Sequence, residues 1–229
     1  MSALSAREGR AVVDVLYDEI HDEILSGTIE PGTKLTEVMV ATRYSVARPS
    51  ARAVIERLVG VGLLQRILNR APQVPLLQSG DIRDLYIGRR AIEREVVAQL
   101  AREGRVPPET RRMIAELRIA SAYDALPESV ASGVEFHRLL VNGLGSARMT
   151  RMYNSIIGEV QLAIAQVQGH RLLSPVDIAD QHDEILDAIA ARQVERAVAA
   201  ISEHLDHAEA SLHNDVESGE KPNGSEIVA

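Results

Sequence analysis

The 229-residue sequence contains no cysteine and no tryptophan, and Phe136 is its single phenylalanine. Without cysteine, the chain can form no disulfide and can offer no thiolate to a metal or a substrate. No apolar run approaches the roughly 20 residues that span a bilayer, and the first ten residues lack the basic and apolar regions of a secretory signal. We therefore expect a cytoplasmic protein without a membrane segment.

The scarcity of aromatic residues also limits how a core can be built. Aromatic residues make up 3% of the chain, whereas 45% of it is hydrophobic, so alanine and the aliphatic residues must fill the interior. This composition favours helices packed on helices. A chain of this length can bury one large core or two modest ones.

Charge is distributed unevenly along this acidic chain, whose formal net charge is −8. Residues 1–76 hold nine basic and nine acidic residues, so the acidic excess lies in residues 77–229. Residues 43–70 carry six arginines opposed only by Glu56. Such a basic face can attract a polyanion at close range, because salt screens exposed charges beyond about 8–10 Å. In the alternative interpretation, the same arginines belong to a solvated basic helix that pairs with the acidic second half of the chain.

Residues 1–77 predict a small domain of three helices and a hairpin. Pro31-Gly32 forms a turn after the first helix, and Thr36 is expected to cap the second. The third helix follows a break near Ser45, and two short apolar runs around the NRAP segment indicate a β-hairpin. The expected helices are Gly9–Ser26, Glu37–Tyr44 and Pro49–Val61, and the expected strands are Leu64–Leu68 and Gln73–Leu77. This order is typical of a winged helix-turn-helix domain.

The stretch SVARPSARAVIERL, residues 45–58, would then contain the recognition helix. Arg48 and Arg52 are four residues apart and project from one face at its N-terminal end. Arginines in that place can pair with guanine in a major groove. Arg57 lies on the opposite side of the helix, so we expect it to form an ion pair or to contact phosphate.

The tip of the predicted hairpin carries Asn69 and Arg70, where a wing would contact the DNA backbone or the minor groove. The predicted DNA-binding residues are Thr36, Arg43, Arg48, Ser50, Arg52, Asn69 and Arg70.

Beyond residue 78 the pattern is helical, and residues 78–216 predict an all-α helical bundle. The expected helices are Asp81–Glu103, Pro108–Tyr123, Glu128–Asn142, Ala147–Gln168, Pro175–Ala191 and Val194–Val216. Residues 217–229 have the polarity and the Pro/Gly content of a disordered tail. The expected fold class is therefore mainly α, with an N-terminal winged helix-turn-helix domain followed by an all-α bundle.

Several motifs resemble those of one family. LYDEIHDEILSGTIEPGTKLTE, VARPSARAVIERL and GLLQRILNRAPQV resemble the DNA-binding domain of GntR-family transcription regulators. DLYIGRRAIE, EFHRLL and QHDEILDAIAARQVERA resemble the helical, FCD-type ligand-binding domain of the FadR subfamily. The likeness covers about residues 9–215. It implies a repressor that binds a palindromic operator in double-stranded DNA as a homodimer, and whose bundle is an effector domain for a small carboxylate.

The chain departs from the family pattern at the recognition helix. Where the family usually has Gly-Val-Ser-Arg-Thr-Pro-Val-Arg, residues 45–52 read SVARPSAR. Both arginines remain, and proline still suits the first turn of a helix. Ala71 and Pro72 replace the glycine and the small residue usual at the wing tip. The resemblance therefore implies DNA binding but not the family's usual operator sequence.

Two histidines are placed by counting from the break near Arg192. His182 lies ten residues before it and His204 twelve residues after it. In an antiparallel helix pair both would lie about 15–18 Å from the turn, at the same level. Two inward imidazoles at one level are either a hydrogen-bonded pair in the core or metal ligands.

The resemblance adds His137 and implies that His137, His182 and His204 are the three metal-binding histidines of the subfamily. The fourth ligand there is an aspartate, and this chain has Gly133 at that position. The site would then hold a divalent metal through three nitrogens plus water or effector, or it would hold none. Three imidazoles suit zinc, nickel and similar ions.

Arg89 matches an arginine that faces the same cavity in the subfamily. The resemblance therefore implies a carboxylate effector bound by Arg89, His137, His182 and His204. In the alternative interpretation, Arg89 pairs with Glu93, four residues later, on the helix surface.

Two other functional classes compete with a DNA-binding regulator. A helical metalloenzyme built on the three histidines would need a general base near the metal, and no HExxH motif is present. It would also leave the arginines of residues 43–70 without a role, so we do not expect an enzyme. A protein-interaction module with a degenerate DNA-binding domain would account for the changed turn motif.

Overall fold

The computed structural model describes residues 3–68, 70–123, 126–166 and 175–219, which contain nine α-helices and no strand. The helices are α1 (Ala3–Leu25), α2 (Glu37–Arg43), α3 (Arg48–Gly60), α4 (Ser79–Glu103), α5 (Thr110–Ala122), α6 (Leu126–Gly143), α7 (Ala147–Gln166), α8 (Pro175–Ala190) and α9 (Val194–Gly219). The predicted mainly α fold class is confirmed. None of these helices is long and apolar enough to cross a membrane.

The first three helices pack around a small aliphatic core that includes Ile20, Val54 and Leu58. Thr36 caps α2, since its hydroxyl accepts a hydrogen bond from the backbone N–H of Met39 at 3.2 Å. The segment between α2 and α3 forms the tight turn of a helix-turn-helix.

That turn contains Ser45 at a φ of 53°. Glycine is the residue that adopts such left-handed backbone at least cost, and the family pattern has glycine at this position. Arg57 points away from the turn. It forms an ion pair with Asp14 at 2.8 Å and lies over the ring of Tyr17, so the predicted ion-pair role of Arg57 is confirmed.

The predicted strands Leu64–Leu68 and Gln73–Leu77 do not form. Instead, Gln73 makes isolated bridges to Gln65 and to Lys34. Pro72 and Pro75 explain the difference, because proline has no N–H to continue a β-ladder on either side of Gln73. In the described residues the wing is therefore a loop held by single bridges.

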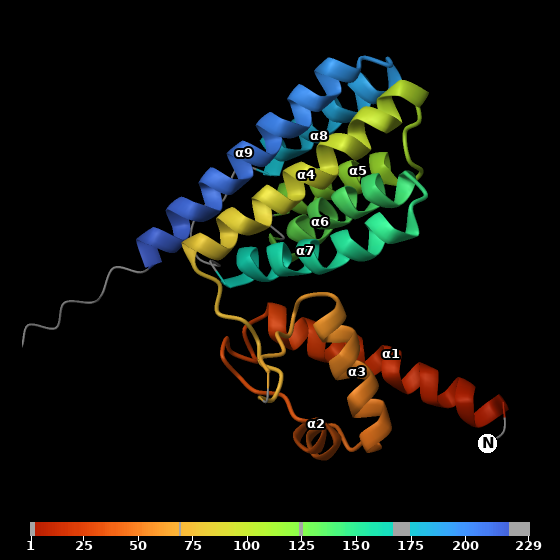
Figure 1. Ribbon diagram of the computed structural model, residues 1–229, viewed down its shortest axis with the longest axis vertical. Coiled ribbons are helices and arrows are strands. Elements are labelled where there is room, and N and C mark those ends of the chain that lie inside the picture. The colour runs from red at the N-terminus through yellow and green to blue at the C-terminus, as the bar shows by residue number, and fades with distance from the viewer. Residues whose placement is uncertain (1–2, 69, 124–125, 167–174, 220–229) are drawn as a thin grey trace, which may run out of the picture.

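The six remaining helices form a separate bundle around a larger core (Figure 1). α4 lies along α9, and α8 and α9 form an antiparallel pair joined at Arg192, whose φ is 57°. α9 continues to Gly219, so residues 217–219 of the predicted tail are helical. Residues 220–229 lie outside the described residues.

α7 lies on the side of the bundle that faces the N-terminal helices (Figure 1). Its Leu162 is fully buried in the core of the N-terminal domain. The side-chain amide of Gln166 accepts a hydrogen bond from the N–H of Leu77 at 3.1 Å and donates one to the carbonyl of Pro75 at 2.7 Å. α7 therefore belongs to the packing of both domains.

We expect Gly158→Ala to disrupt this junction. A Cβ at Gly158 would overlap the backbone carbonyl oxygen of Val61, and overpacking of this kind costs about 1–3 kcal/mol. Urea unfolding of the full-length variant measures the loss. Gly80→Ala is the matched control, because a Cβ at Gly80 meets no atom within 4 Å. If both variants unfold like the wild type, the two domains are not packed through α7.

Candidate functional site

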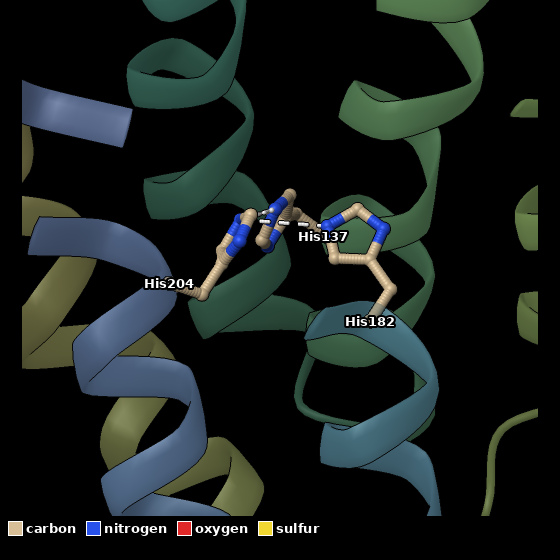
Figure 2. A group of neighbouring side chains, drawn as sticks. All are labelled: His137, His182 and His204. Carbon is tan, nitrogen blue, oxygen red and sulfur yellow. Dashed lines mark hydrogen bonds between the residues drawn. The ribbon is translucent and has the colours of Figure 1, made fainter. Parts of the chain in front are cut away.

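Three buried histidines from different helices converge in the bundle. His137 lies on α6, His182 on α8 and His204 on α9, and their side chains point toward one another (Figure 2). Nε2 of His204 is 3.0 Å from Nε2 of His137 and 3.4 Å from Nε2 of His182. The prediction that His182 and His204 lie at one level is confirmed.

Two of the rings are oriented by acceptors on their outer sides. Nδ1 of His137 lies 2.7 Å from a carboxylate oxygen of Glu93, and Nδ1 of His204 lies 2.8 Å from the amide oxygen of Gln181. Because these oxygens only accept, each Nδ1 carries the proton and each Nε2 presents its lone pair inward. Metal-binding histidines are commonly held in this way. His182 is instead stacked on Phe136, with ring centroids 3.8 Å apart.

Burial lowers the pKa of all three histidines below the ordinary value for imidazole. They are therefore neutral near pH 7, and the lone pairs of His137 and His204 face each other at 3.0 Å. Such an arrangement is repulsive unless a proton or a cation lies between the nitrogens. Ligand nitrogens of the three residues lie within 4.8 Å of one another, so the group can hold a divalent metal ion.

A buried ion pair adjoins the histidines. Arg89 and Glu93 are 3% and 0% exposed, and Nε of Arg89 donates to Glu93 at 2.7 Å. Tyr153 donates its hydroxyl proton to the same carboxylate oxygen at 2.7 Å. Burial alone would raise the pKa of Glu93, but Arg89 and His137 hold it well below its usual range. Glu93 is therefore a carboxylate with donors from α4, α6 and α7.

Arg89 pairs with Glu93, but the alternative interpretation of a pair on the helix surface is wrong, because both side chains are buried inside the bundle. Arg89 also lines the cavity beside the histidines. Its Nη2 is buried and has no hydrogen-bond partner among the described residues, and the same holds for Nδ1 of His182. These two polar atoms are available to a ligand.

The cavity has a volume of about 100 Å³, and none of the described carboxylates lines it. Its wall is mostly apolar and includes Leu117, Val130, Val134, Ile157, Val160 and Ile164. Gly133 also lines it, and a Cβ at that position would meet no atom within 4 Å. The position where the subfamily has its aspartate is therefore open space in this protein.

Glu93, Tyr153 and Gln181 were not predicted as site residues. Glu93 and Tyr153 could have been found from the sequence, because each is a polar residue at a position where the helix otherwise presents apolar side chains inward. Gln181 directly precedes His182 and carries no comparable signal. Its role depends on the packing of α8 against α9.

The predicted DNA-contacting residues lie on the N-terminal domain. Arg48 and Arg70 are exposed, and neither forms an ion pair with a carboxylate of the described residues. Ser50 is half-buried in the first turn of α3. Asn69 lies outside the described residues.

Two further arginines of this surface are held by carboxylates. Arg52 forms two hydrogen bonds with Glu37, at 2.6 and 3.3 Å, and lowers the pKa of that carboxyl. Arg43 donates to Glu23 at 2.6 Å. Thr36 uses its hydroxyl to cap α2. Arg48 is therefore the arginine of the recognition helix that is most available to an incoming duplex.

Two known domains match this chain. Residues 84–207 match the FCD domain, and residues 13–74 match the gntR family of bacterial regulatory proteins. An inferred D-xylose utilization operon transcriptional repressor of Paenarthrobacter nicotinovorans is 25% identical over 215 residues, which cover 90% of this chain and 91% of the relative. The gluconate operon transcriptional repressor of Bacillus subtilis (strain 168) is 22% identical over 201 residues, covering 85% and 82%.

Solved structures give the same result. An inferred GntR transcriptional regulator from Rhodococcus sp. RHA1 has a TM-score of 0.71 at 25% identity, with 88% of this chain and 97% of that chain covered. McbR/YncC of E. coli shares the fold, with a TM-score of 0.70 at 17% identity and coverage of 89% and 97%. The matched family and the relatives named as repressors or regulators are transcriptional regulators and not enzymes. The chain belongs to the GntR family of bacterial transcriptional regulators and combines its helix-turn-helix domain with an FCD domain.

Proposed function

We propose that this protein is a cytoplasmic repressor whose affinity for a palindromic operator is controlled by a small carboxylate and a divalent metal bound in the FCD domain. The observation that carries the proposal is the convergence of three Nε2 atoms beside Arg89 in one cavity. The relatives named as repressors of sugar-utilization operons support repression as the direction of control.

The side chains of this cavity can bind a metal ion and an anion at the same time. His137, His182 and His204 would hold the ion, and the ion would supply positive charge to an anionic ligand. Gly133 leaves open the position of the subfamily's fourth ligand, so an oxygen of the effector would complete the coordination. Nη2 of Arg89 is the second donor to that carboxylate. Each ligand then strengthens the binding of the other.

α7 supplies a physical connection between this cavity and the DNA-binding domain. Ile157, Val160 and Ile164 line the cavity, whereas Leu162 and Gln166 of the same helix contact the N-terminal domain. A ligand that moves α7 would therefore also move the recognition helix. Because one helix-turn-helix reads one half-site, control of a palindrome requires two such domains in a fixed relation.

Arg48→Ala should weaken specific operator binding by about 1–3 kcal/mol and relax discrimination at one base position, because a direct base contact is lost. Arg70→Ala should instead weaken specific and nonspecific DNA about equally and reduce the salt slope by about one. Fluorescence anisotropy with an operator fragment at several salt concentrations measures both effects. Arg148→Ala, on α7, is the control. Wild-type binding by both variants would contradict the assignment of the recognition helix and the wing.

The full-length protein should sediment as a dimer at micromolar concentration and bind a palindromic fragment as one dimer. Two half-sites one helical turn apart need two domains joined by the protein. Sedimentation velocity with and without DNA measures this stoichiometry, and a fragment with one half-site is the control. Tight binding of a single monomer to the palindrome would overturn the dimer proposal.

Gly133→Asp should tighten metal binding and make it less dependent on an added acid, because the new carboxylate occupies the open position. Asp also replaces a glycine, which is disfavoured in a helix. Competition titration and metal analysis of the purified variant measure the affinity and the content. His182→Ala should lose metal, and His21→Ala, outside the bundle, should not. If wild type and Gly133→Asp bind no divalent metal, the histidines are core residues.

A further inference from the structure

We propose that the ligand of this cavity is a small monocarboxylate with a compact apolar body, and not a polyhydroxylated sugar acid. The inference rests on the proposed function, because it takes the carboxylate-binding groups of the cavity as given. It separates this protein from the sugar acid that the name of its gluconate-operon relative would suggest.

The cationic and imidazole groups of the cavity are connected to one another. Glu93 joins Arg89 to His137, and the ring of His137 contacts those of His182 and His204. Arg89 lies over the ring of Tyr86. Among the residues that the structure describes, the rest of the wall is aliphatic apart from Gly133 and the hydroxyl-bearing Ser129. A hydroxyl group placed against such a wall gives up its hydrogen bonds to water and gains none in return.

A sugar acid carries one hydroxyl on nearly every carbon. Most of them would remain unpaired in this cavity, and each unpaired group weakens binding by about tenfold or more. The charge of Arg89 is already balanced by Glu93 at 2.7 Å, so Arg89 does not offer an unbalanced charge to a second carboxylate. That second carboxylate would lie against the apolar wall. The wall therefore selects an apolar body attached to a single carboxylate.

The size of the space limits that body. The cavity is small, about 100 Å³, whereas sites for drug-sized ligands measure roughly 300–1,000 Å³. Part of the space exists because Gly133 has no side chain, since a Cβ there would meet nothing within 4 Å. Glycine is disfavoured in a helix interior, and at this position it leaves room beside the other lining residues. A short branched acid fits this room.

Isothermal titration of the zinc-loaded and the metal-free full-length protein tests the proposal. The probes are 3-methylbutanoate, gluconate, and 3-methylbutanamide, which keeps the shape and removes the charge. We expect 3-methylbutanoate to bind the zinc-loaded protein at least tenfold more tightly than either of the other two. We also expect its affinity to fall when zinc is removed.

Two variants test the wall itself. Val134→Thr places a hydroxyl in the wall without changing its shape and should weaken 3-methylbutanoate severalfold, whereas Val141→Thr, buried on α6 outside the cavity, should not. Gly133→Ala should weaken 3-methylbutanoate more than acetate, because the new methyl fills the room for the branched body. This second variant keeps the test informative if a threonine unfolds the bundle.

The outcomes distinguish the two proposals. If gluconate binds as tightly as 3-methylbutanoate and depends on zinc, the apolar-ligand inference is wrong and the proposed function stands. If neither acid binds with or without zinc, both fail. A preference for 3-methylbutanoate that is unchanged in Val134→Thr and in Gly133→Ala would also overturn the inference, since the site would then lie elsewhere.

Discussion

The candidate site depends on one buried carboxylate. Glu93 is fully enclosed, and it stays ionised because Arg89, Tyr153 and His137 all donate to it from within about 3 Å. Removing one partner of a buried charge network of this kind costs about 3–5 kcal/mol, because the remaining charge is left unpaired in a low dielectric. Glu93 thus joins α4, α6 and α7 at a single point.

The same carboxylate prepares the histidines for a cation. By accepting from Nδ1 of His137, it directs the Nε2 lone pair of that ring toward the other two imidazoles. It also holds Arg89 through Nε, and Nη2 of the guanidinium has no hydrogen-bond partner among the described residues. α7 connects this arrangement to the other domain, because Tyr153 and Ile157 are buried in the core of the bundle and Leu162 of the same helix is buried in the core of the N-terminal domain. The candidate site and the DNA-binding domain therefore share α7.

Local patterns were enough to predict most of the fold. Helical periodicity, the Thr36 cap and the break near Arg192 depend on neighbouring residues, and the level of His182 with His204 follows from helix rise alone. The predicted strands failed because Pro72 and Pro75 interrupt the ladder. The two prolines are visible in the sequence, but which ladder hydrogen bonds they remove depends on which residues pair across the hairpin.

The remaining features depend on tertiary packing. No spacing in the sequence indicates that Glu37 would hold Arg52, or that Leu162 of the bundle would complete the core of the other domain. His137 was placed with the other two histidines by family resemblance, and the structure brings the three rings together. The sequence shows that Gly133 has no side chain, but the apolar residues that surround it depend on how α6 packs.

The central claim is that Glu93 organises a metal and carboxylate site which controls DNA affinity. Its most direct test is the operator affinity of wild type and Glu93→Gln, measured by fluorescence anisotropy with and without zinc across a set of small carboxylic acids. Glutamine keeps the shape of the side chain and removes the charge that holds Arg89 and His137. We predict that at least one acid changes the operator affinity of the wild type by tenfold or more only when zinc is present, and that Glu93→Gln binds the operator but no longer responds. An equal response of both proteins, or a wild-type response independent of zinc, would contradict the account.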